Sequence, residues 1–509
     1  MRTNQDISLW LAGTAGNAQL ASDSRRIMAG DVFFAYPGAA GDGRDFIPAA
    51  LAQGAAAVLY EAGDFVWNEA WQAPHMAVDQ LQKNAGPIAH AFYAMPDAAL
   101  FCVGLTGTNG KTSCAVWLGQ ALSRLGQPTV VIGTLGVGLF KSNDPVKFDV
   151  TGYTTPDAVL LARKLAESRA AGATALAIEV SSIGLDQGRA DGMHFDVALF
   201  TNLTRDHLDY HADMAAYEAA KTRLFDWPGL KSAVVNLDDA MGLRLVAHVK
   251  GKLAGQFPVL GYTLADSGAQ PDIEGVAVLR ASALRSRHTG TDFHLDSPFG
   301  AALVKTQLVG HFNISNALGV LAVLLAKGVP LRAAIEAIEG LTPVPGRMQQ
   351  VGGQDAPMVV IDYAHTPDAL EKTLRTLRQV AFERSGKLWC VFGCGGDRDP
   401  GKRGQMGAIA QIADHILVTS DNPRSEDPHA IIAQIVAGMH PSSVDVQTLE
   451  DRAAAILFAI KHAAKTDLIL LAGKGHEQYQ EIKGKKLPFS DADHAALALA
   501  ARATMKRPS

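Results

Sequence analysis

Residues 107–113, Gly107-Thr108-Asn109-Gly110-Lys111-Thr112-Ser113, decide the fold of this sequence. The apolar run Ala98–Gly104 comes before them, and the helical pattern CAVWLGQALSRL follows. A glycine-rich turn between a strand and a helix lets backbone N–H groups face phosphates, and the helix N-terminus adds positive potential. We therefore predict an ATP site in which Lys111 reaches the β- and γ-phosphates and the Thr112 hydroxyl binds Mg²⁺.

The match to a general phosphate-binding loop is incomplete. Leu105 stands where the pattern G-x-x-x-x-G-K-[ST] has its first glycine, and Gly104 lies one residue early. The alternative is a glycine-rich turn that carries a surface lysine.

The composition of the chain excludes several classes of protein. The 509 residues are 48% hydrophobic and 19% charged, which is globular composition and enough chain for about three domains. The net charge of −5 argues against a nucleic-acid-binding protein, which needs a basic face. No apolar run approaches the ~18 residues of a membrane span, and the N-terminus has no signal-peptide pattern.

The four cysteines do not form a disulfide framework. Cys390 and Cys394 have no Cys/His cluster near them that would suggest zinc. We expect Cys102, Cys114, Cys390 and Cys394 to be small apolar residues beside strands, in a reducing cytoplasm.

Apolar runs alternate with helical periods along the chain, which predicts βαβ units and parallel sheets, an α/β fold. Three blocks separate, at residues 1–95, 96–341 and 342–509, with LTPVPGRMQ as a linker. Polar residues gather just after the apolar runs. Ligands of parallel sheets bind at the carboxyl ends of strands. The polar residues at the ends of the predicted strands therefore indicate two ligand-binding sites, or one cleft between two sheets.

Glu179, His207 and Lys221 lie in segments that could contribute to a metal site. Glu179 lies at the end of the run ALAIEV, where a carboxylate beside the phosphate loop can hold a hard divalent cation; a capping or ion-pair role is the alternative. His207 has acidic neighbours in TNLTRDHLDYH, although a lone histidine is more often structural. Lys221 lies in the helical segment AAYEAAKTRLF, and composition alone predicts an ordinary solvated lysine there.

A series of motifs in a fixed order resembles the Mur ligase family. The motifs are TGTNGKTS, EVSSIGLDQGR, TNLTRDHLDYH, GHFNISNALG, PGRMQ, DYAHTPDAL, FGCGGDRD, DNPR and GKGHE. The resemblance covers essentially the whole chain. It implies a small N-terminal α/β domain that binds UDP, a central P-loop ATPase-like domain with a mostly parallel sheet, and a C-terminal Rossmann-like domain that binds an amino acid.

The resemblance also implies a reaction, in cytoplasmic peptidoglycan precursor synthesis. ATP phosphorylates a substrate carboxylate to an acyl phosphate, and the amine of an incoming amino acid then displaces phosphate. By resemblance, Thr112 and Glu179 bind one Mg²⁺, while His207 and a carbamylated Lys221 bind a second. The loop Gly107–Ser113 would bind ATP, together with Asn313, Arg347 and Asp362, with His365 as a weaker candidate.

The same resemblance assigns a site for the nucleotide-sugar substrate, UDP-N-acetylmuramoyl-L-alanyl-D-glutamate. Polar donors and an arginine suit such an anionic molecule. Taken alone, the serines and threonines could equally be turn or helix-cap residues. The implied residues are Ser22, Ser24, Ala39, Ala40, Gly41, Thr154, Thr155, Ser181, Gln187 and Arg189.

The turn Asp421-Asn422-Pro423-Arg424 decides which amino acid is added. In the family, DNPR accompanies meso-2,6-diaminopimelate. Its distal carboxylate can pair with Arg424 at two points, whereas lysine would bring a repelled ammonium there. Arg398, Gly473 and Glu477 match the family's other contacts to this amino acid. The alternative is that DNPR is only an Asn-Pro turn.

Pro400 departs from the family's pattern, in which a lysine is frequent after GDRD. A proline at this position predicts a stiffer loop.

Two other hypotheses remain. One keeps the ligase chemistry with another substrate, as lysine addition or as a folylpolyglutamate-type relative; Arg424 and the first 95 residues argue against both. The other is a P-loop nucleotide-binding switch, which explains neither an amine pocket nor the repeated polar strand ends. We expect small-molecule substrates and a monomer.

Overall fold

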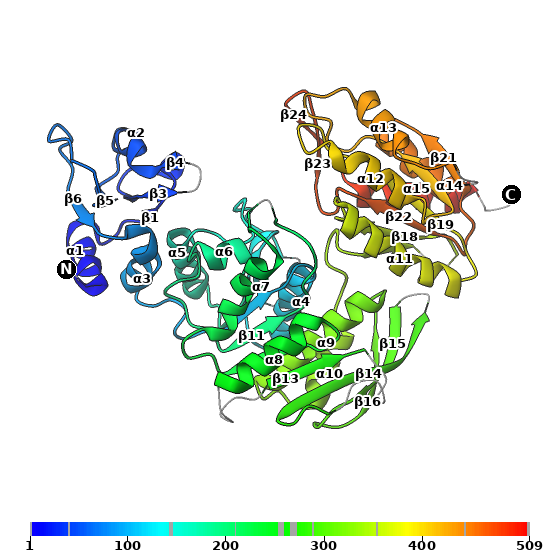
Figure 1. The fold of residues 1–509 in the computed structure, drawn as a ribbon, viewed down its shortest axis with the longest axis horizontal. Coiled ribbons are helices and arrows are strands. Elements are labelled where there is room, and N and C mark those ends of the chain that lie inside the picture. Colours follow the sequence, from blue (N-terminus) through cyan, green and yellow to red (C-terminus); the bar gives the residue numbers. More distant parts are fainter. Residues whose placement is uncertain are drawn as a thin grey trace. The chain divides into compact units, whose positions relative to one another are not determined.

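The computed structural model describes residues 3–38, 41–141, 146–208, 210–252, 259–264, 272–287, 290–352, 355–441 and 444–505. Figure 1 traces the chain by colour from the N- to the C-terminus. It forms two compact units. The first unit is Met1–Arg280, Ser297–Gly300 and Asn316–Ile338, and the second is Ala281–Asp296, Ala301–Ser315 and Glu339–Ser509.

The first unit begins with a small parallel sheet in the order β1-β2-β5-β6. Alternate side chains of a strand point to opposite faces, so Val32 and Phe34 pack under α1 and α3, while Phe33 faces α2. The capping box of Thr3 and Asp6 starts α1. The elements are α1 (Asn4–Ala15), β1 (Leu20–Ala21), β2 (Val32–Ala35), α2 (Ile47–Ala52), β5 (Ala57–Glu61), β6 (His75–Val78) and α3 (Leu81–Phe92), with β3 (Pro37–Gly38) pairing β4 (Gly41–Asp42).

The strands of the larger sheet that contribute to the first unit run in the order β14-β13-β12-β11-β7-β10-β8-β9. Their pairs are parallel except β8 with β9. The strands are β7 (Phe101–Thr106), β8 (Thr129–Gly133), β9 (Gly136–Phe140), β10 (Ala175–Glu179), β11 (Val197–Phe200), β12 (Ser232–Asn236), β13 (Val259–Thr263) and β14 (Val276–Arg287), whose residues up to Arg280 belong to this unit. Helices cover both faces, which is why most strands read as continuous apolar runs.

The strand order reverses at β7, because β10 and β8 lie on one side of it and β11 to β13 on the other. Such a switch point opens a crevice at the carboxyl end of the strand, where ligands of α/β sheets bind. On one sheet face pack α5 (Ala158–Ala170), α6 (Ser182–Asp186) and α8 (Ala240–Lys252), while α4 (Lys111–Arg124) packs against β7, β8 and β10. The remaining helices are α7 (Met214–Thr222), α9 (His311–Ala326), whose residues from Asn316 belong to this unit, and α10 (Leu331–Glu339).

The second unit holds a sheet in the order β17-β18-β22-β19-β20-β21, parallel except for β17. Its strands are β17 (Gln349–Gly352), β18 (Met358–Asp362), β19 (Leu388–Phe392), β20 (His415–Val418), β21 (Asp445–Thr448) and β22 (Leu468–Ala472). One face packs on α11 (Pro367–Glu383), α12 (Gly401–Ala410) and α13 (Pro428–Ala437). The other packs on α14 (Arg452–His462) and α15 (Asp491–Met505).

Two antiparallel pairs also belong to the second unit. They are β15 (Gly290–Asp296) with β16 (Ala302–Thr306), and β23 (Tyr479–Ile482) with β24 (Lys485–Pro488). The predicted parallel α/β architecture is confirmed, whereas these pairs were not expected from the sequence.

The four cysteines are unpaired and buried, as predicted. Among the described residues, no helix has the length and apolar character that crossing a membrane requires.

Candidate functional site

The phosphate loop lies between the end of β7 and the start of α4, as predicted. Gly107 and Gly110 have φ of 144° and 88°, a region that side chains disfavour. A Cβ at Gly107 would lie 2.0 Å from Thr201 Oγ1, and one at Gly110 would lie 2.5 Å from Asn316 Oδ1. Both positions therefore require glycine, for conformation as well as for space.

A segment after β11 braces this loop. The Thr201 hydroxyl donates to the Asn109 carbonyl at 2.6 Å, and the Asn109 N–H donates to Asn202 Oδ1 at 2.9 Å. The Thr204 N–H donates to the Thr108 hydroxyl at 3.0 Å. Thr201, Asn202 and Thr204 lie in the motif TNLTRDHLDYH but were not predicted to have a role. Their signal was the polar cluster that directly follows an apolar strand.

The residues at the start of α4 are positioned for phosphate. The Lys111 ammonium donates to the carbonyls of Gly107 and Thr108, at 2.7 and 2.8 Å, so it folds over the loop. Thr112 and Ser113 are buried in the first turn of the helix. A cation beside a loop of backbone N–H groups at a helix N-terminus is suited to an anionic phosphate chain.

Glu179 ends β10, directly beside Leu105 of β7. Its carboxylate is buried and accepts from the Thr134 N–H at 2.9 Å and from the Thr134 hydroxyl at 3.3 Å. A Cβ on Gly133 would lie 2.1 Å from Glu179 Oε1, so only glycine leaves room for the carboxylate. The carboxylate of Glu179 and the hydroxyl of Thr112 are the hard oxygen donors that fit Mg²⁺.

Lys221 is buried on α7, with 1% of its surface exposed, so the expectation of a solvated lysine from composition is wrong. Its Nζ donates to the Gly107 carbonyl at 2.9 Å and lies 4.3 Å from the centre of the Tyr217 ring. Burial, together with the nearby charge of Lys111, lowers the pKa of Lys221 well below its usual value. A neutral amine is therefore favoured directly behind the phosphate loop.

His207 joins the same group through Tyr217. The two rings are 6.1 Å apart, and the Tyr217 hydroxyl lies 3.1 Å from the Thr108 hydroxyl. His207 has φ of 53°, and its half-exposed imidazole lies 3.6 Å from Asp206. His207, Tyr217 and Lys221 thus gather beside Gly107 and Thr108 of the loop.

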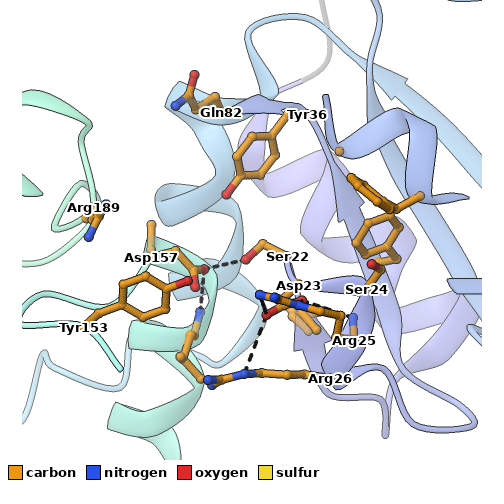
Figure 2. A pocket seen from close by; sticks show the side chains of 18 of the residues that line it. Ser22, Asp23, Ser24, Arg25, Arg26, Tyr36, Gln82, Tyr153, Asp157 and Arg189 are labelled. Atoms are coloured by element: carbon orange, nitrogen blue, oxygen red, sulfur yellow. Dashed lines mark hydrogen bonds and ion pairs between the residues drawn. The ribbon is translucent and has the colours of Figure 1, made fainter. Parts of the chain in front are cut away.

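A pocket of about 600 Å³ opens in the first unit, between the N-terminal sheet and the start of α5. Figure 2 shows the Ser22 hydroxyl directed at Asp157, to which it donates at 2.8 Å. Asp157 also caps α5, accepting from the N–H groups of Val159 and Leu160. Burial and the nearby Asp157 charge raise the pKa of Tyr36, which keeps its phenol protonated. The basic lining residues are Arg25, Arg26, Arg163 and Arg189.

Half of the predicted substrate residues line this pocket: Ser22, Ser24, Gly41, Gln187 and Arg189. Ala39 and Ala40 lie outside the described residues. Asp157, Tyr36, Arg26 and Arg163 also line the pocket and were not among the predicted residues, although Arg26 and Asp157 lie in the same short segments as predicted ones.

Thr154, Thr155 and Ser181 connect the pocket to Glu179. Arg189 donates to the Thr155 carbonyl at 2.9 Å, and the Thr155 hydroxyl donates to the Glu179 carbonyl at 2.9 Å. The Ser181 hydroxyl lies 3.1 Å from the Thr155 hydroxyl. The hydroxyls of Thr154 and Thr134 are 3.1 Å apart, and Thr134 in turn holds Glu179. A hydrogen-bonded path therefore runs from the pocket to the edge that carries the phosphate loop.

Three predicted nucleotide residues belong to the second unit. The Asn313 amide donates to the Val309 carbonyl at 2.9 Å. The Arg347 guanidinium stacks on Tyr363 at 4.9 Å, and its buried Nε has no hydrogen-bond partner among the described residues. Asp362 accepts from the N–H groups of Met348 and Ala364, and burial raises its pKa. His365 lies nearby, with Nδ1 2.8 Å from the Tyr363 carbonyl.

The turn Asp421–Arg424 is built around buried polar groups. Burial raises the pKa of Asp421, and a Cβ on Gly473 would lie 2.5 Å from its carboxylate. Asn422 donates to Glu477 at 2.8 Å and accepts from the buried Lys474 at 3.0 Å. Lys474 also donates to Glu477 at 3.0 Å. The structure thus brings together the predicted Asp421, Asn422, Gly473 and Glu477, and adds Lys474.

Arg424 is largely enclosed and donates to the Gly396 carbonyl at 2.7 Å and to Glu481 at 3.2 Å. Arg398, in contrast, is exposed. Pro400 takes the N-cap position of α12 with φ of −73°, so proline is compatible with the backbone at this helix start.

Cys102, His194 and Asp196 form another group of potential metal ligands, with ligand atoms within 4.8 Å of one another. Lys231 lies 2.7 Å from Asp196, and His194 Nδ1 lies 2.8 Å from Asp97. Hydrogen bonds to Asp196, Asp97 and Cys102 raise the pKa of His194 to about 12. The charges of this group are already balanced, and we interpret it as an ion-pair cluster.

Comparison with known proteins identifies relatives along the whole chain. Three family models match: "Mur ligase family, catalytic domain" over residues 18–93, "Mur ligase middle domain" over 105–324 and "Mur ligase, glutamate ligase domain" over 346–475. The chain is 64% identical over 493 residues to the UDP-N-acetylmuramoyl-L-alanyl-D-glutamate–2,6-diaminopimelate ligase of Janthinobacterium sp. (strain Marseille), covering 97% of this chain and 96% of that one.

Two further relatives have the same name as the Janthinobacterium ligase. The ligase of the same name from Ralstonia nicotianae is 53% identical over 501 residues, covering 97% of this chain and 95% of the relative. A solved structure of a UDP-N-acetylmuramoyl-L-alanyl-D-glutamate–2,6-diaminopimelate ligase matches with a TM-score of 0.68 at 36% identity, covering 95% of each chain.

Proposed function

Because the chain belongs to the Mur ligase family, we propose that it adds meso-2,6-diaminopimelate to UDP-N-acetylmuramoyl-L-alanyl-D-glutamate in an ATP-dependent, ADP-forming reaction. The identity of 64% over nearly the full length of both chains supports this substrate pair. The reaction belongs to peptidoglycan precursor synthesis in the cytoplasm. We assign residues 1–95 to the UDP-sugar domain, 96–341 to the ATP domain and 342–509 to the amino-acid domain.

The chemistry proceeds in two steps. A carboxylate oxygen of the substrate attacks the γ-phosphorus of ATP, the bond to the β-phosphate oxygen breaks, and an acyl phosphate and ADP form. The amine of diaminopimelate then attacks the acyl carbon, loses a proton and expels inorganic phosphate, which leaves an amide. Two anions must meet in the first step, so the site has to neutralise charge where they approach.

The observation that carries the proposal is the hydrogen-bonded path between the basic pocket and the phosphate-loop edge. Arg189 lines the pocket and holds Thr155, which holds Glu179 through its backbone carbonyl. The pocket for the nucleotide-sugar and the loop for the ATP phosphates would thus be formed by elements of one compact unit. A simple nucleotide switch needs no second anion pocket connected in this way.

We assign ATP binding to the loop Gly107–Ser113, with Asn313, Arg347 and Asp362. Lys111 would bind the β- and γ-phosphates. Thr112 and Glu179 would hold one Mg²⁺, and His207 with Lys221 a second; when bound, these ions would neutralise the phosphate charge. The buried Nε of Arg347 has no hydrogen-bond partner within the described part of the chain and is suited to donate to a nucleotide.

Lys221 would serve the second ion as a carbamate. An ammonium repels Mg²⁺, whereas a neutral amine can attack CO₂ and release a proton to give an anionic carbamate. The lowered pKa of Lys221 favours that neutral amine. Its nearness to the Gly107 carbonyl puts the modified group beside the phosphates.

We assign the nucleotide-sugar peptide to Ser22, Ser24, the segment Ala39–Gly41, Thr154, Thr155, Ser181, Gln187 and Arg189. Diaminopimelate would be held by Arg398, Asp421, Asn422, Pro423, Arg424, Gly473 and Glu477. Arg424 would pair with the distal carboxylate and Glu477 would accept from an amine. Lysine has no distal carboxylate, so its addition would leave Arg424 without that partner.

Phosphate release tests this proposal. The purified chain is incubated with UDP-N-acetylmuramoyl-L-alanyl-D-glutamate, ATP and Mg²⁺, with diaminopimelate or lysine added in turn. We expect phosphate release that requires diaminopimelate and a product heavier by one diaminopimelate residue. Release that is indifferent to the added amine would refute the proposal, and release with lysine alone would favour the lysine-adding alternative.

A further inference from the structure

The hairpin of β23 and β24, residues 479–488, is hydrogen-bonded to the turn Asp421–Arg424. The Gln480 amide donates to the Asp421 carbonyl at 2.7 Å, and the Glu481 N–H donates to Asn422 Oδ1 at 2.9 Å. The Arg424 N–H donates to the Glu481 carbonyl at 3.0 Å, and the Lys483 N–H donates to the Arg424 carbonyl at 2.7 Å. The backbone of Arg424 is therefore held on both sides by the hairpin.

This support matters because Arg424 has φ of 52°, in the left-handed region that few residues other than glycine adopt. A residue keeps such a conformation only where its surroundings impose it. The conformation fixes the direction in which the Cα–Cβ bond leaves the turn. The hairpin thus fixes the position and direction from which the Arg424 side chain extends.

Glu481 also orients the guanidinium itself. Its Oε2 accepts from Arg424 Nε at 3.2 Å, while the Gly396 carbonyl accepts from Nη1 at 2.7 Å. Two anchored nitrogens fix the plane of a guanidinium, since its donors form a rigid fork. The described residues give Nη2 no hydrogen-bond partner, so this nitrogen is available to a ligand.

We infer that Glu481 is a positioning residue for the choice of amino acid: it holds Arg424, through backbone and side chain, so that the guanidinium meets the distal carboxylate of diaminopimelate. Glu481 acts through Arg424 and need not contact the substrate. The inference rests on the proposed function, and it extends the specificity site from the DNPR turn to a hairpin that lies 57 positions further along the chain.

The test uses Glu481→Ala and Glu481→Gln in the full chain, with Lys485→Ala as the matched control on the exposed partner strand of the same hairpin. Glu481→Ala should raise the KM for diaminopimelate at least tenfold and leave the KM for ATP and for the nucleotide-sugar within twofold. Glu481→Gln should recover part of the loss, because an amide oxygen can still accept from Nε. Lys485→Ala should behave as the wild type.

An unchanged KM for diaminopimelate in Glu481→Ala would overturn the inference, as would an equal rise of all three KM values in a protein that melts at the wild-type temperature. If Glu481→Ala fails to fold, the comparison rests on Glu481→Gln, which must then show a selective rise of at least twofold. Diaminopimelate binding to wild type and variant, measured by calorimetry, separates the two proposals. Wild type that binds diaminopimelate but forms no amide contradicts the proposed function alone.

Discussion

The amine of Lys221 donates to the backbone carbonyl of Gly107 at 2.9 Å, which places a buried lysine directly behind the phosphate loop. Among the described residues no carboxylate forms an ion pair with this amine. Burial of an unpaired ammonium is costly, so the neutral form is favoured and can react with CO₂.

Lys221→Ala should reduce kcat at least 100-fold, because the second cation loses its anionic ligand. A short carboxylate such as acetate or formate should restore part of the activity by occupying the space left by the side chain. Steady-state phosphate release with and without the additive measures both effects. Lys83→Ala, at an exposed position, is the control. Full activity of Lys221→Ala without additive would show that no carbamate is required.

Gly133→Ala should lower kcat by about tenfold or more and raise the Mg²⁺ concentration needed for half-maximal activity. The new methyl group would lie 2.1 Å from Glu179 Oε1 and must push the carboxylate aside. The control is Gly13→Ala, because a Cβ at Gly13 meets nothing within 4 Å. Calorimetric Mg²⁺ titration of the nucleotide-bound protein gives a second readout. Identical Mg²⁺ dependence in Gly133→Ala and wild type would exclude Glu179 from the metal site.

Arg424→Ala should raise the KM for diaminopimelate at least 30-fold while ATP affinity stays within twofold. The loss of a charged partner for a carboxylate accounts for an effect of this size, about 2 kcal/mol. Arg424→Lys should restore little, because a point charge cannot make the two-point contact. An amino-acid profile unchanged from wild type would remove Arg424 from the acceptor site.

The His194 cluster predicts a pH-dependent contribution to stability. Its folded pKa of about 12 lies above the ordinary value of 6.5, so the stabilisation is complete below pH 6.5 and declines as pH rises toward 12. His194 is 35% exposed, so solvent screening reduces the effect, and we expect His194→Gln to cost about 1–2 kcal/mol at pH 6. Urea unfolding at pH 6 and pH 9 should show a smaller difference between variant and wild type at pH 9. A difference that grows with pH would contradict the ion-pair interpretation.

The sequence predicted those parts of the site that lie in one continuous motif after an apolar run. Gly107, Gly110 and Lys111 follow β7, Glu179 ends β10, and the parallel pairing of these two strands puts all four residues at one edge of the sheet. The local sequence pattern is sufficient to predict these residues, because the carboxyl ends of parallel strands meet at the same edge of the sheet.

Residues whose role depends on distant packing could not be predicted in this way. Lys221 has the helical neighbours of a solvated lysine, and only the packing of α7 behind the phosphate loop buries it. Thr134 touches Glu179 across 45 positions, and Glu481 touches Arg424 across 57. No periodicity or short motif encodes such contacts. The resemblance to a family supplied Lys221 but neither Thr134 nor Glu481.

The transfer of oxygen from substrate to phosphate tests the central claim most directly. UDP-N-acetylmuramoyl-L-alanyl-D-glutamate labelled with ¹⁸O in its reacting carboxylate is turned over with ATP, Mg²⁺ and diaminopimelate, and the released phosphate is analysed by mass spectrometry. An acyl phosphate requires one ¹⁸O atom in each phosphate released with amide formation. Phosphate without label, or labelled phosphate that forms equally well without diaminopimelate, would contradict the account.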